Sequence, residues 1–307
     1  MTTPIGVLVM AYGGPSSLGE VERYLLDVRG FRPTPPEVVA QVRERYARIG
    51  GRSPILERTE AQARALQDAL RDGGRPYEVA VGMRHWHPYI GDALARMSER
   101  GVREVVGVVM APHYSRLSIG AYYAEVEEAQ SGVMVRGIES WHLLPGYVRA
   151  VADHVRAALA RLPEAAQRDA PVIFTAHSLP ERIRTWDDPY PRQLAETVDA
   201  VMAVLGPRPH RLAYQSASHT QEPWLGPDVS EVLDELAGAG ARHVVVAPIG
   251  FVSEHVEILY DLDIELVERA AELGVRLERI AMLNDAPGMI AGLADLTRAT
   301  ARAAGWT

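Results

Sequence analysis

Apolar residues occur in short continuous runs along the chain, and longer amphipathic stretches separate these runs. Runs rich in Val and Ile that do not alternate with polar residues predict strands buried on both faces. They lie at 5–12, 77–83, 104–112, 133–140, 171–177, 211–217, 243–250 and 275–283. Between them, helical patterns fall at 36–48, 56–72, 90–100, 146–162, 191–205 and 229–239. Alternating strands and helices predict parallel α/β sheets.

The two halves of the chain contain the same order of predicted elements and of the Gly and Pro residues between them. In 87–115 a Pro-aromatic pair is followed by an amphipathic helix, a Gly, a Val-rich strand and Ala-Pro, and 222–253 has the same order. The spacing is too long for a solenoid repeat. It predicts two similar α/β domains, each with a four-stranded parallel sheet flanked by helices. The expected domains are 1–145 with a lid segment at 16–55, then 146–285, and a helix at 286–307 that can pack back on the first domain.

Residues capable of chemistry stand at the ends of most predicted strands. Ligands of parallel sheets bind beyond the carboxyl ends of the strands, and in a two-domain protein the cleft between the domains is the expected site. The candidates are Tyr12-Gly13-Gly14, Arg84-His85, His113-Tyr114, His177-Ser178, Gln215-Ser216 and Ser253-Glu254.

The segment 250–270 combines an apolar surface with a stripe of acids. On an α-helix these acids would share about a quarter of the circumference. No basic residue interleaves the stripe, and like charges four residues apart repel one another. Carboxylates this crowded hold either protons or cations, which favours a route for metal or protons over a solvated helix face. The acids are Glu254, Glu257, Asp261, Glu265 and Glu268.

His177 ends a predicted buried strand and is followed by a turn with proline. A hydrogen-bonded structural histidine is the alternative interpretation. Imidazole is the one neutral strong nitrogen donor available to a chain without cysteine. One imidazole and one carboxylate are too few for a closed structural metal centre. They would suit an ion that is bound and then given up.

Composition and charge exclude several classes of protein. The 307 residues include no Cys and no Lys, which excludes disulfides, thiolate metal sites, iron–sulfur clusters and Schiff-base chemistry. The net charge of −8 gives no basic footprint for nucleic acid. No apolar run approaches the roughly 20 residues that span a bilayer, and the N-terminus lacks the basic region of a signal peptide. A cytoplasmic monomer is expected.

The stretch 23–55 is basic and rich in aromatic residues. It predicts either a solvated helix pair or a lid whose arginines bind carboxylates through two hydrogen bonds each.

Four motifs occur in order along the chain: LVMAYGGP, TAHSLPERI, PWLGPDV and PIGFVSEHVEILYDLDIE. Together they resemble the motifs of ferrochelatases, which insert ferrous iron into a porphyrin, and the resemblance covers essentially the whole chain. It implies two Rossmann-like domains with the porphyrin in the cleft between them. It also implies that no cofactor is permanently bound and that Fe²⁺ is a substrate. A second divalent ion at the acidic helix face is a further expectation.

The resemblance also assigns roles to residues. His177 and Glu257 match the catalytic, iron-binding pair, and Asp261 and Glu265 match the outer path of the metal. The cleft-lining positions match Trp224, Arg84 and His85.

The substrate expectation depends on Tyr12, which stands where the protoporphyrin branch of the family typically has Met. With no Cys, the chain also lacks that branch's C-terminal cysteine cluster. The chain therefore resembles the coproporphyrin III branch, in which Tyr12 would ligate the product iron. Gly30 stands where some relatives carry a second arginine. The positions that match contacts to porphyrin carboxylates are Arg29, Arg45, Tyr46, Ser53 and Tyr122.

Three alternatives stay open at this point: a protoporphyrin IX ferrochelatase, a sirohydrochlorin-type cobalt chelatase and a non-catalytic tetrapyrrole carrier. In the expected mechanism the cleft bends the macrocycle so that its nitrogens face His177 and Glu257, using binding energy from the propionates. His177 would either bind iron or accept a pyrrole proton.

Overall fold

The computed structural model describes residues 3–71, 74–218, 220 and 222–306. Two four-stranded sheets run in the orders β2-β1-β3-β4 and β6-β5-β7-β8, and every pair of neighbouring strands is parallel. The first sheet contains β1 (Ile5–Ala11), β2 (Tyr77–Met83), β3 (Glu104–Val109) and β4 (Met134–Ile138). The second contains β5 (Val172–His177), β6 (His210–Gln215), β7 (His243–Pro248) and β8 (Arg276–Arg279). The predicted strands and the two-sheet α/β fold are confirmed.

The internal repeat corresponds to equivalent positions in the two sheets. Helix α4 (Ile90–Glu99) leads into β3, and α9 (Val229–Gly238) leads into β7. Both strands occupy the third position of their sheet. Similar sequence patterns therefore form the same topological unit twice.

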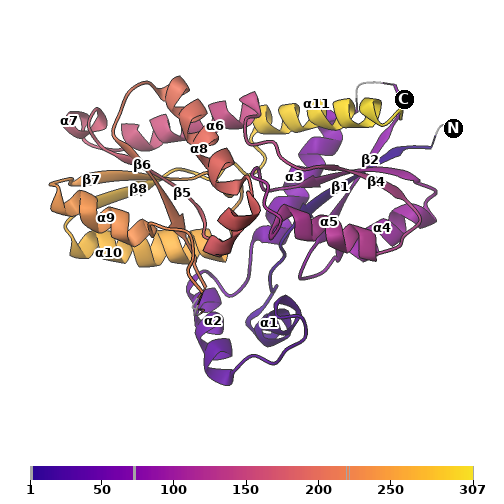
Figure 1. The fold of residues 1–307 in the computed structure, drawn as a ribbon, viewed down its shortest axis with the longest axis horizontal. Coiled ribbons are helices and arrows are strands. Elements are labelled where there is room, and N and C mark those ends of the chain that lie inside the picture. The colour runs from indigo at the N-terminus through magenta and orange to yellow at the C-terminus, as the bar shows by residue number, and fades with distance from the viewer. Residues whose placement is uncertain (1–2, 72–73, 219, 221, 307) are drawn as a thin grey trace.

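Helices flank both sheets, and Figure 1 shows the two lobes side by side with α1 and α2 apart from either sheet. The lid segment contains η1 (Leu18–Glu20), α1 (Val21–Val28) and α2 (Pro36–Arg48). The first sheet is accompanied by α3 (Ile55–Ala69), α4 and α5 (Ile119–Glu128). The second is accompanied by α6 (Pro145–Ala160), α7 (Glu164–Gln167), η2 (Glu181–Trp186), α8 (Tyr190–Leu205), α9 and α10 (Val267–Glu272), and α11 (Pro287–Ala303) ends the described chain.

One hydrophobic core runs across one face of both sheets. Alternate residues of a strand point to opposite faces, and Val7 and Val9 of β1 join Val172 and Phe174 of β5 in the same buried cluster. Side chains of α3, α6, α8 and α11 complete this cluster. The opposite faces are covered separately, by α4 and α5 on the first sheet and by α9, η3 (Glu257–Leu266) and α10 on the second. The shared core fixes the two sheets relative to each other.

The acidic segment departs from the predicted α-helix. Residues Glu257–Leu266 form a π-helix, η3, which continues directly into α10. A π-helix closes its hydrogen bonds between residues five apart, so the α-helical spacing used on the sequence was wrong for this segment. Long π-helices are rare and short ones occur frequently at functional sites.

Helices α6 and α11 cross where two glycines meet. A Cβ on Gly146 would lie 1.9 Å from the carbonyl oxygen of Gly288. Because that oxygen belongs to the backbone, the crossing cannot adapt by moving a side chain. Helix α11 also contacts α3 of the first domain, so the crossing helps to join the two halves.

We expect Gly146→Ala to lower the free energy of unfolding by about 3 kcal/mol, since the added methyl group overpacks the crossing. Gly238→Ala in α9 is the matched control, because nothing lies within 4 Å of its added Cβ. The control should change stability by less than about 1 kcal/mol, in the stabilising direction. Urea unfolding of both variants measures the difference, and equal stability of the two would contradict the proposed crossing constraint.

A buried histidine follows β3 and contacts the second domain. His113 is 2% exposed, and its Nε2 lies 2.9 Å from Oγ1 of Thr197 on α8. Its Nδ1 is buried and has no hydrogen-bond partner among the described residues. Burial, and then the neighbouring charge of His142, lowers the pKa of His113 well below its ordinary value. The imidazole is therefore neutral in the folded protein.

Because the unfolded chain binds a proton at His113 below about pH 6.5 and the folded protein does not, stability should fall as the pH drops below that value. His113→Gln keeps an amide donor for Thr197 and cannot titrate. Its stability should depend less steeply on pH between 6.5 and 5, by up to about 1.4 kcal/mol per pH unit. Chemical unfolding across this range tests the prediction, and an unchanged slope in the variant would contradict it.

Candidate active site

His177 lies at the end of β5 with one ring nitrogen already engaged. Its Nδ1 contacts the carbonyl oxygen of Ser178, so Nδ1 carries the proton and donates it. The Nε2 lone pair is then free, and Nε2 lies 3.6 Å from Oε1 of Glu257. The hydroxyl of Tyr190 donates to the backbone carbonyl of His177 at 2.9 Å. The hydrogen bond from Nδ1 to the Ser178 carbonyl fixes the tautomer and ring orientation that metal-binding histidines need.

Glu257 begins the π-helix, and the ends of β5 and β6 hold it in place. Gln215 donates from Nε2 to the Glu257 carbonyl at 3.0 Å, and the Thr175 hydroxyl donates to Oε1 of Gln215 at 2.8 Å. Just upstream, a Cβ on Gly250 would lie 2.7 Å from Cβ of Ala176. Only glycine lets the chain cross β5 this closely on its way to Glu257.

His255 is a site residue that the sequence pattern did not single out. Its Nε2 lies 3.7 Å from Oε2 of Glu257, on the other side of the carboxylate from His177. The His255 Nδ1 lies 3.1 Å from the carbonyl oxygen of Ser253. Its position two residues before Glu257 was the signal available in the sequence, but a loop histidine carries no periodicity that marks it.

The charges around Glu257 decide its protonation. Burial acts to raise the pKa of Glu257, but its interactions with His177, His255 and Arg45 outweigh burial and bring the pKa below its ordinary value. Asp261 behaves in the opposite way, because burial and the charge of Glu257 raise its pKa to about 6. Its Oδ2 accepts a hydrogen bond of 2.5 Å from the Ser216 hydroxyl. Glu257 is therefore ionised at neutral pH. Asp261 takes up a proton when the pH falls to about 6.

Tyr12 of the first domain lies within electrostatic reach of Glu257. It follows β1, is 39% exposed, and its ring centroid lies 4.6 Å from that of His85. The turn behind it needs glycine: Gly13 has φ +92°, and its Cβ would lie 2.9 Å from the Trp86 backbone nitrogen. Desolvation, and then the charge of Glu257, raises the pKa of Tyr12 to about 12. The phenol is protonated at neutral pH, and its pKa depends on the charge of Glu257 in the other domain.

Arg84 and His85, two predicted cleft residues, have partners in the first domain. Nδ1 of His85 lies 2.9 Å from Oδ1 of Asp27 on α1. Arg84 donates from Nε to Glu125 at 2.8 Å, and its guanidinium lies 5.6 Å from the Tyr122 ring centroid. These contacts tie the lid and α5 to the strand end beside Tyr12.

The remaining predicted porphyrin contacts differ in their surroundings. Tyr46 and Tyr122 are 2% and 6% exposed, and their contact with porphyrin carboxylates stays a prediction. Arg29 is exposed at the end of α1, next to Gly30 with φ +61°. The Ser53 backbone nitrogen donates to the Pro15 carbonyl at 2.8 Å, close to the Tyr12 turn. The Trp224 ring centroid lies 6.5 Å from that of His177.

The acidic stripe is compensated, which corrects the expectation of unpartnered carboxylates. Arg58 on α3 lies 3.0 Å from Glu254, Arg45 on α2 lies 3.9 Å from Asp261, and Arg48 on α2 lies 2.5 Å from Glu268. Glu265 is exposed. All three arginines come from the first domain, more than 190 positions away in sequence. No interleaving basic residue was needed, because α2 of the lid and α3 supply the positive charges.

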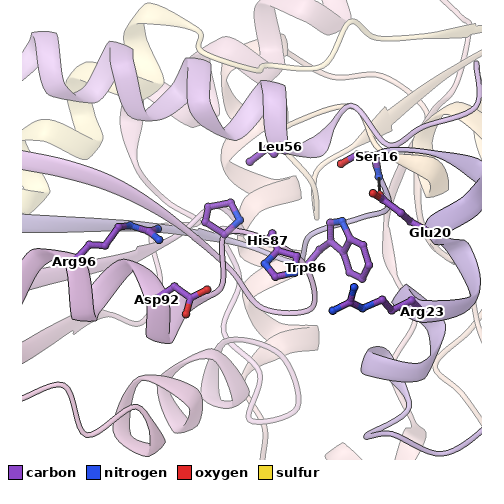
Figure 2. A pocket seen from close by; sticks show the side chains of 9 residues that line it. Ser16, Glu20, Arg23, Leu56, Trp86, His87, Asp92 and Arg96 are labelled. Atoms are coloured by element: carbon purple, nitrogen blue, oxygen red, sulfur yellow. Dashed lines mark hydrogen bonds between the residues drawn. The ribbon is translucent and has the colours of Figure 1, made fainter.

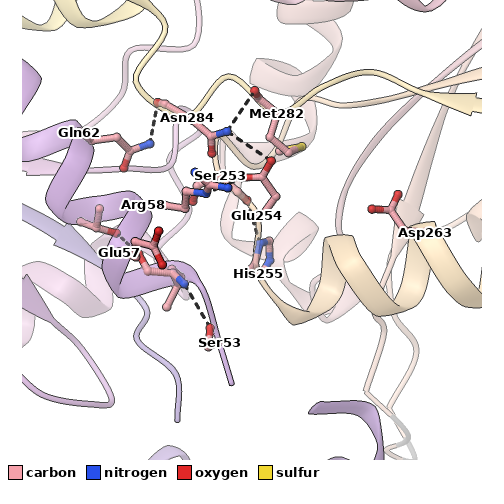
Figure 3. A network of polar contacts seen from close by, with 12 residues as sticks. Ser53, Glu57, Arg58, Gln62, Ser253, Glu254, His255, Asp263, Met282 and Asn284 are labelled. Atoms are coloured by element: carbon pink, nitrogen blue, oxygen red, sulfur yellow. Dashed lines mark hydrogen bonds and ion pairs between the residues drawn. The ribbon is translucent and has the colours of Figure 1, made fainter. Parts of the chain in front are cut away.

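Around Glu254 the two domains share a polar network, shown in Figure 3. Gln62 of α3 donates to the Asn284 carbonyl at 2.8 Å, and Asn284 donates to Oε1 of Glu254 at 3.3 Å. Arg58 lies against the other oxygen of Glu254. The segment that leads to His255 and Glu257 is thus held by the first domain.

No group of three or more His, Asp or Glu side chains among the described residues is arranged to hold a metal ion. The expected second divalent ion at the acidic face stays a prediction without a formed site. Within the same residues, no helix is both long enough and apolar enough to cross a membrane.

A cavity of about 520 Å³ lies away from the predicted site, between the lid and the first sheet. Figure 2 shows His87 and Trp86 at its centre, with Arg23 and Arg96 on opposite sides. None of its lining residues is a predicted site residue. His87 thus lines this cavity, whereas its neighbour His85 contacts Tyr12.

Two parallel sheets with a histidine–carboxylate pair facing a tyrosine define a two-domain chelatase-type protein. A solved structure with this architecture, SirB from Bacillus subtilis with Fe³⁺, has a TM-score of 0.59 at 12% identity and covers 98% of this chain and 97% of its own. At that identity the likeness concerns the fold alone.

The family model described as Ferrochelatase matches residues 4–301. The ferrochelatase of Herpetosiphon aurantiacus is 41% identical, covering 94% of this chain and 97% of its own length. The coproporphyrin III ferrochelatase of Listeria monocytogenes serovar 1/2a is 40% identical, covering 94% of this chain and 95% of its own. The chain belongs to the ferrochelatase family, and is an enzyme that inserts a metal ion into a porphyrin.

Glu257→Gln should lower kcat for metal insertion by roughly 100-fold or more, because an amide can neither neutralise the metal nor accept a proton. Porphyrin binding, measured by fluorescence quenching, should change by no more than a few-fold. Glu272→Gln is the matched control, since Glu272 is 66% exposed on α10 and outside the site. Full turnover by Glu257→Gln would remove Glu257 from the chemistry.

Proposed function

We propose that the enzyme inserts Fe²⁺ into coproporphyrin III and releases two protons, giving Fe-coproporphyrin. The observation that carries the proposal is the free Nε2 of His177, 3.6 Å from an ionised Glu257, opposite Tyr12 of the other domain. Fe²⁺ enters as a substrate and leaves inside the product.

The chemistry requires a metal ligand that releases its ion and a group that takes up protons. Two pyrrole N–H bonds break, Fe²⁺ binds the four ring nitrogens, and both protons leave the ring. Nε2 of His177 can donate its lone pair to iron or accept one of these protons, and the Glu257 carboxylate balances the charge of either. Asp261, with its pKa near neutrality, is suited to pass protons on. A bent macrocycle exposes its nitrogen lone pairs on one face, and propionate binding would supply the energy for bending.

The choice of coproporphyrin III rests on carboxylates and on Tyr12. Coproporphyrin III carries four propionates and protoporphyrin IX carries two, so a lid with available arginines favours the former. Arg29 is exposed, and Arg45 is 42% exposed beside the acids of η3. The Listeria relative is named for coproporphyrin III, whereas the Herpetosiphon relative is named simply as a ferrochelatase. Tyr12 supplies a phenol oxygen that would ligate the product iron once it is deprotonated.

The substrate is tested by anaerobic Fe²⁺ insertion into coproporphyrin III and protoporphyrin IX, measured side by side. The change in porphyrin absorbance reports the insertion. We expect kcat/KM to be at least about tenfold higher for coproporphyrin III, because each additional charged hydrogen bond contributes about 1.5–3 kcal/mol. A preference for protoporphyrin IX would retain the enzyme class and contradict the roles of Tyr12 and the lid. Binding of both rings without insertion would indicate a carrier.

A further inference from the structure

Tyr260 lies close to two arginines of the lid, and none of the roles described above uses it. It belongs to η3, and its ring centroid lies 5.1 Å from Cζ of Arg45 and 5.5 Å from Cζ of Arg48, both on α2. These are cation–π distances. One aromatic ring of the second domain therefore holds two cations of the lid.

The two arginines use their hydrogen-bond donors differently. Arg48 donates from Nη2 to Oε1 of Glu268 at 2.5 Å, which anchors α2 to the second domain. Arg45 forms no hydrogen bond with any residue that the structure describes. Its nearest acid, Asp261, lies at 3.9 Å and already accepts the Ser216 hydroxyl through Oδ2. Only Arg45 therefore keeps its donors free.

A stacked guanidinium is well suited to receive a carboxylate. The ring of Tyr260 attracts the guanidinium charge, while the N–H donors of the guanidinium lie in its own plane and stay available for a two-pronged hydrogen bond. A free arginine side chain loses rotamer freedom when it binds, and holding it in place beforehand reduces that loss. The ion pair with Asp261 is long and partly exposed, so a ligand can displace it at little cost.

We infer that Tyr260 is a positioning residue, which presents Arg45 to a carboxylate of the porphyrin while Arg48 and Glu268 fix the lid. This inference rests on the proposed function, because it takes a porphyrin propionate as the ligand of Arg45. It places a determinant of porphyrin affinity on the same helix as the metal-site acid Glu257.

The test compares Tyr260→Leu with Tyr260→Phe, using coproporphyrin III as the probe. Leu removes the aromatic face and should raise both the porphyrin Kd, from fluorescence quenching, and the porphyrin KM by about two- to fivefold, the usual strength of an exposed cation–π contact. Phe keeps the face and should stay within twofold of the original protein. The kcat and the KM for Fe²⁺ should be unchanged in both variants. Equal weakening by Phe and Leu would overturn the inference.

A double-mutant cycle separates positioning from a general structural effect. In an Arg45→Met background, Tyr260→Leu should weaken porphyrin binding no further, because Tyr260 acts through Arg45. In an Arg48→Met background the same change should still weaken it. Full additivity with Arg45→Met would overturn the inference, and melting temperatures would show whether Leu simply unfolds the protein, in which case Tyr260→Met completes the cycle.

A failure of the proposed function can be distinguished from a failure of the inference about Tyr260. If the original protein prefers protoporphyrin IX, the substrate assignment fails, and the same cycle is measured with that ring, which also carries carboxylates. Because the Kd readout needs no turnover, the role of Tyr260 is decided in either case.

Discussion

Each sheet contributes one side of the active site, so the site depends on the contacts that hold the two sheets together. Tyr12 follows β1, and His177 ends β5. On one face, the shared hydrophobic core and the crossing at Gly146 and Gly288 join the halves. Close to the site, the network around Glu254 joins them again, three residues before Glu257. The contact that unites the domains is thus continuous with the segment that carries Glu257, the proposed catalytic carboxylate.

Charge links the same two halves. Crowded acids on one helix repel each other, and arginines of α2 and α3 offset this repulsion at Glu254, Asp261 and Glu268. Arg45 lowers the pKa of both Glu257 and Asp261. Any anion that binds Arg45 will weaken that effect, so occupancy of the lid and the protonation of Glu257 and Asp261 are coupled through one guanidinium.

Much of the fold was predictable from the sequence because it depends on local patterns. Continuous Val- and Ile-rich runs mark strands buried on both faces, and the repeated order of motifs indicated two like sheets. The positions of His177 and Tyr12 followed from the rule that sites form beyond strand ends. The pairing of the two sheets' ends across the site then needed the three-dimensional structure, since no sequence spacing encodes it.

The parts that were missed depend on distant partners or rare geometry. The periodicity of 250–270 fits an α-helix, yet the first half of the helix is π-helical, a form without a sequence signature of its own. The arginines that neutralise its acids lie on α2 and α3, so inspection of the segment alone showed none. Burial of Tyr46 and Tyr122 likewise depends on tertiary packing, because an amphipathic tyrosine is compatible with either environment.

The scarcity of ligands at His177 and Glu257 is consistent with an enzyme whose metal is a substrate. A closed site with three or four protein ligands would bind the ion tightly, and that binding energy would have to be overcome when iron moves into the ring. Here the tautomer of His177 is fixed in advance by Ser178, and the Glu257 carboxylate is kept ionised by its neighbours. The two candidate ligands are therefore preorganised, although there are only two of them. Under the proposed function, preorganisation would allow the ion to be received in a defined position, and the low ligand number would allow its release to a macrocycle that offers four nitrogens.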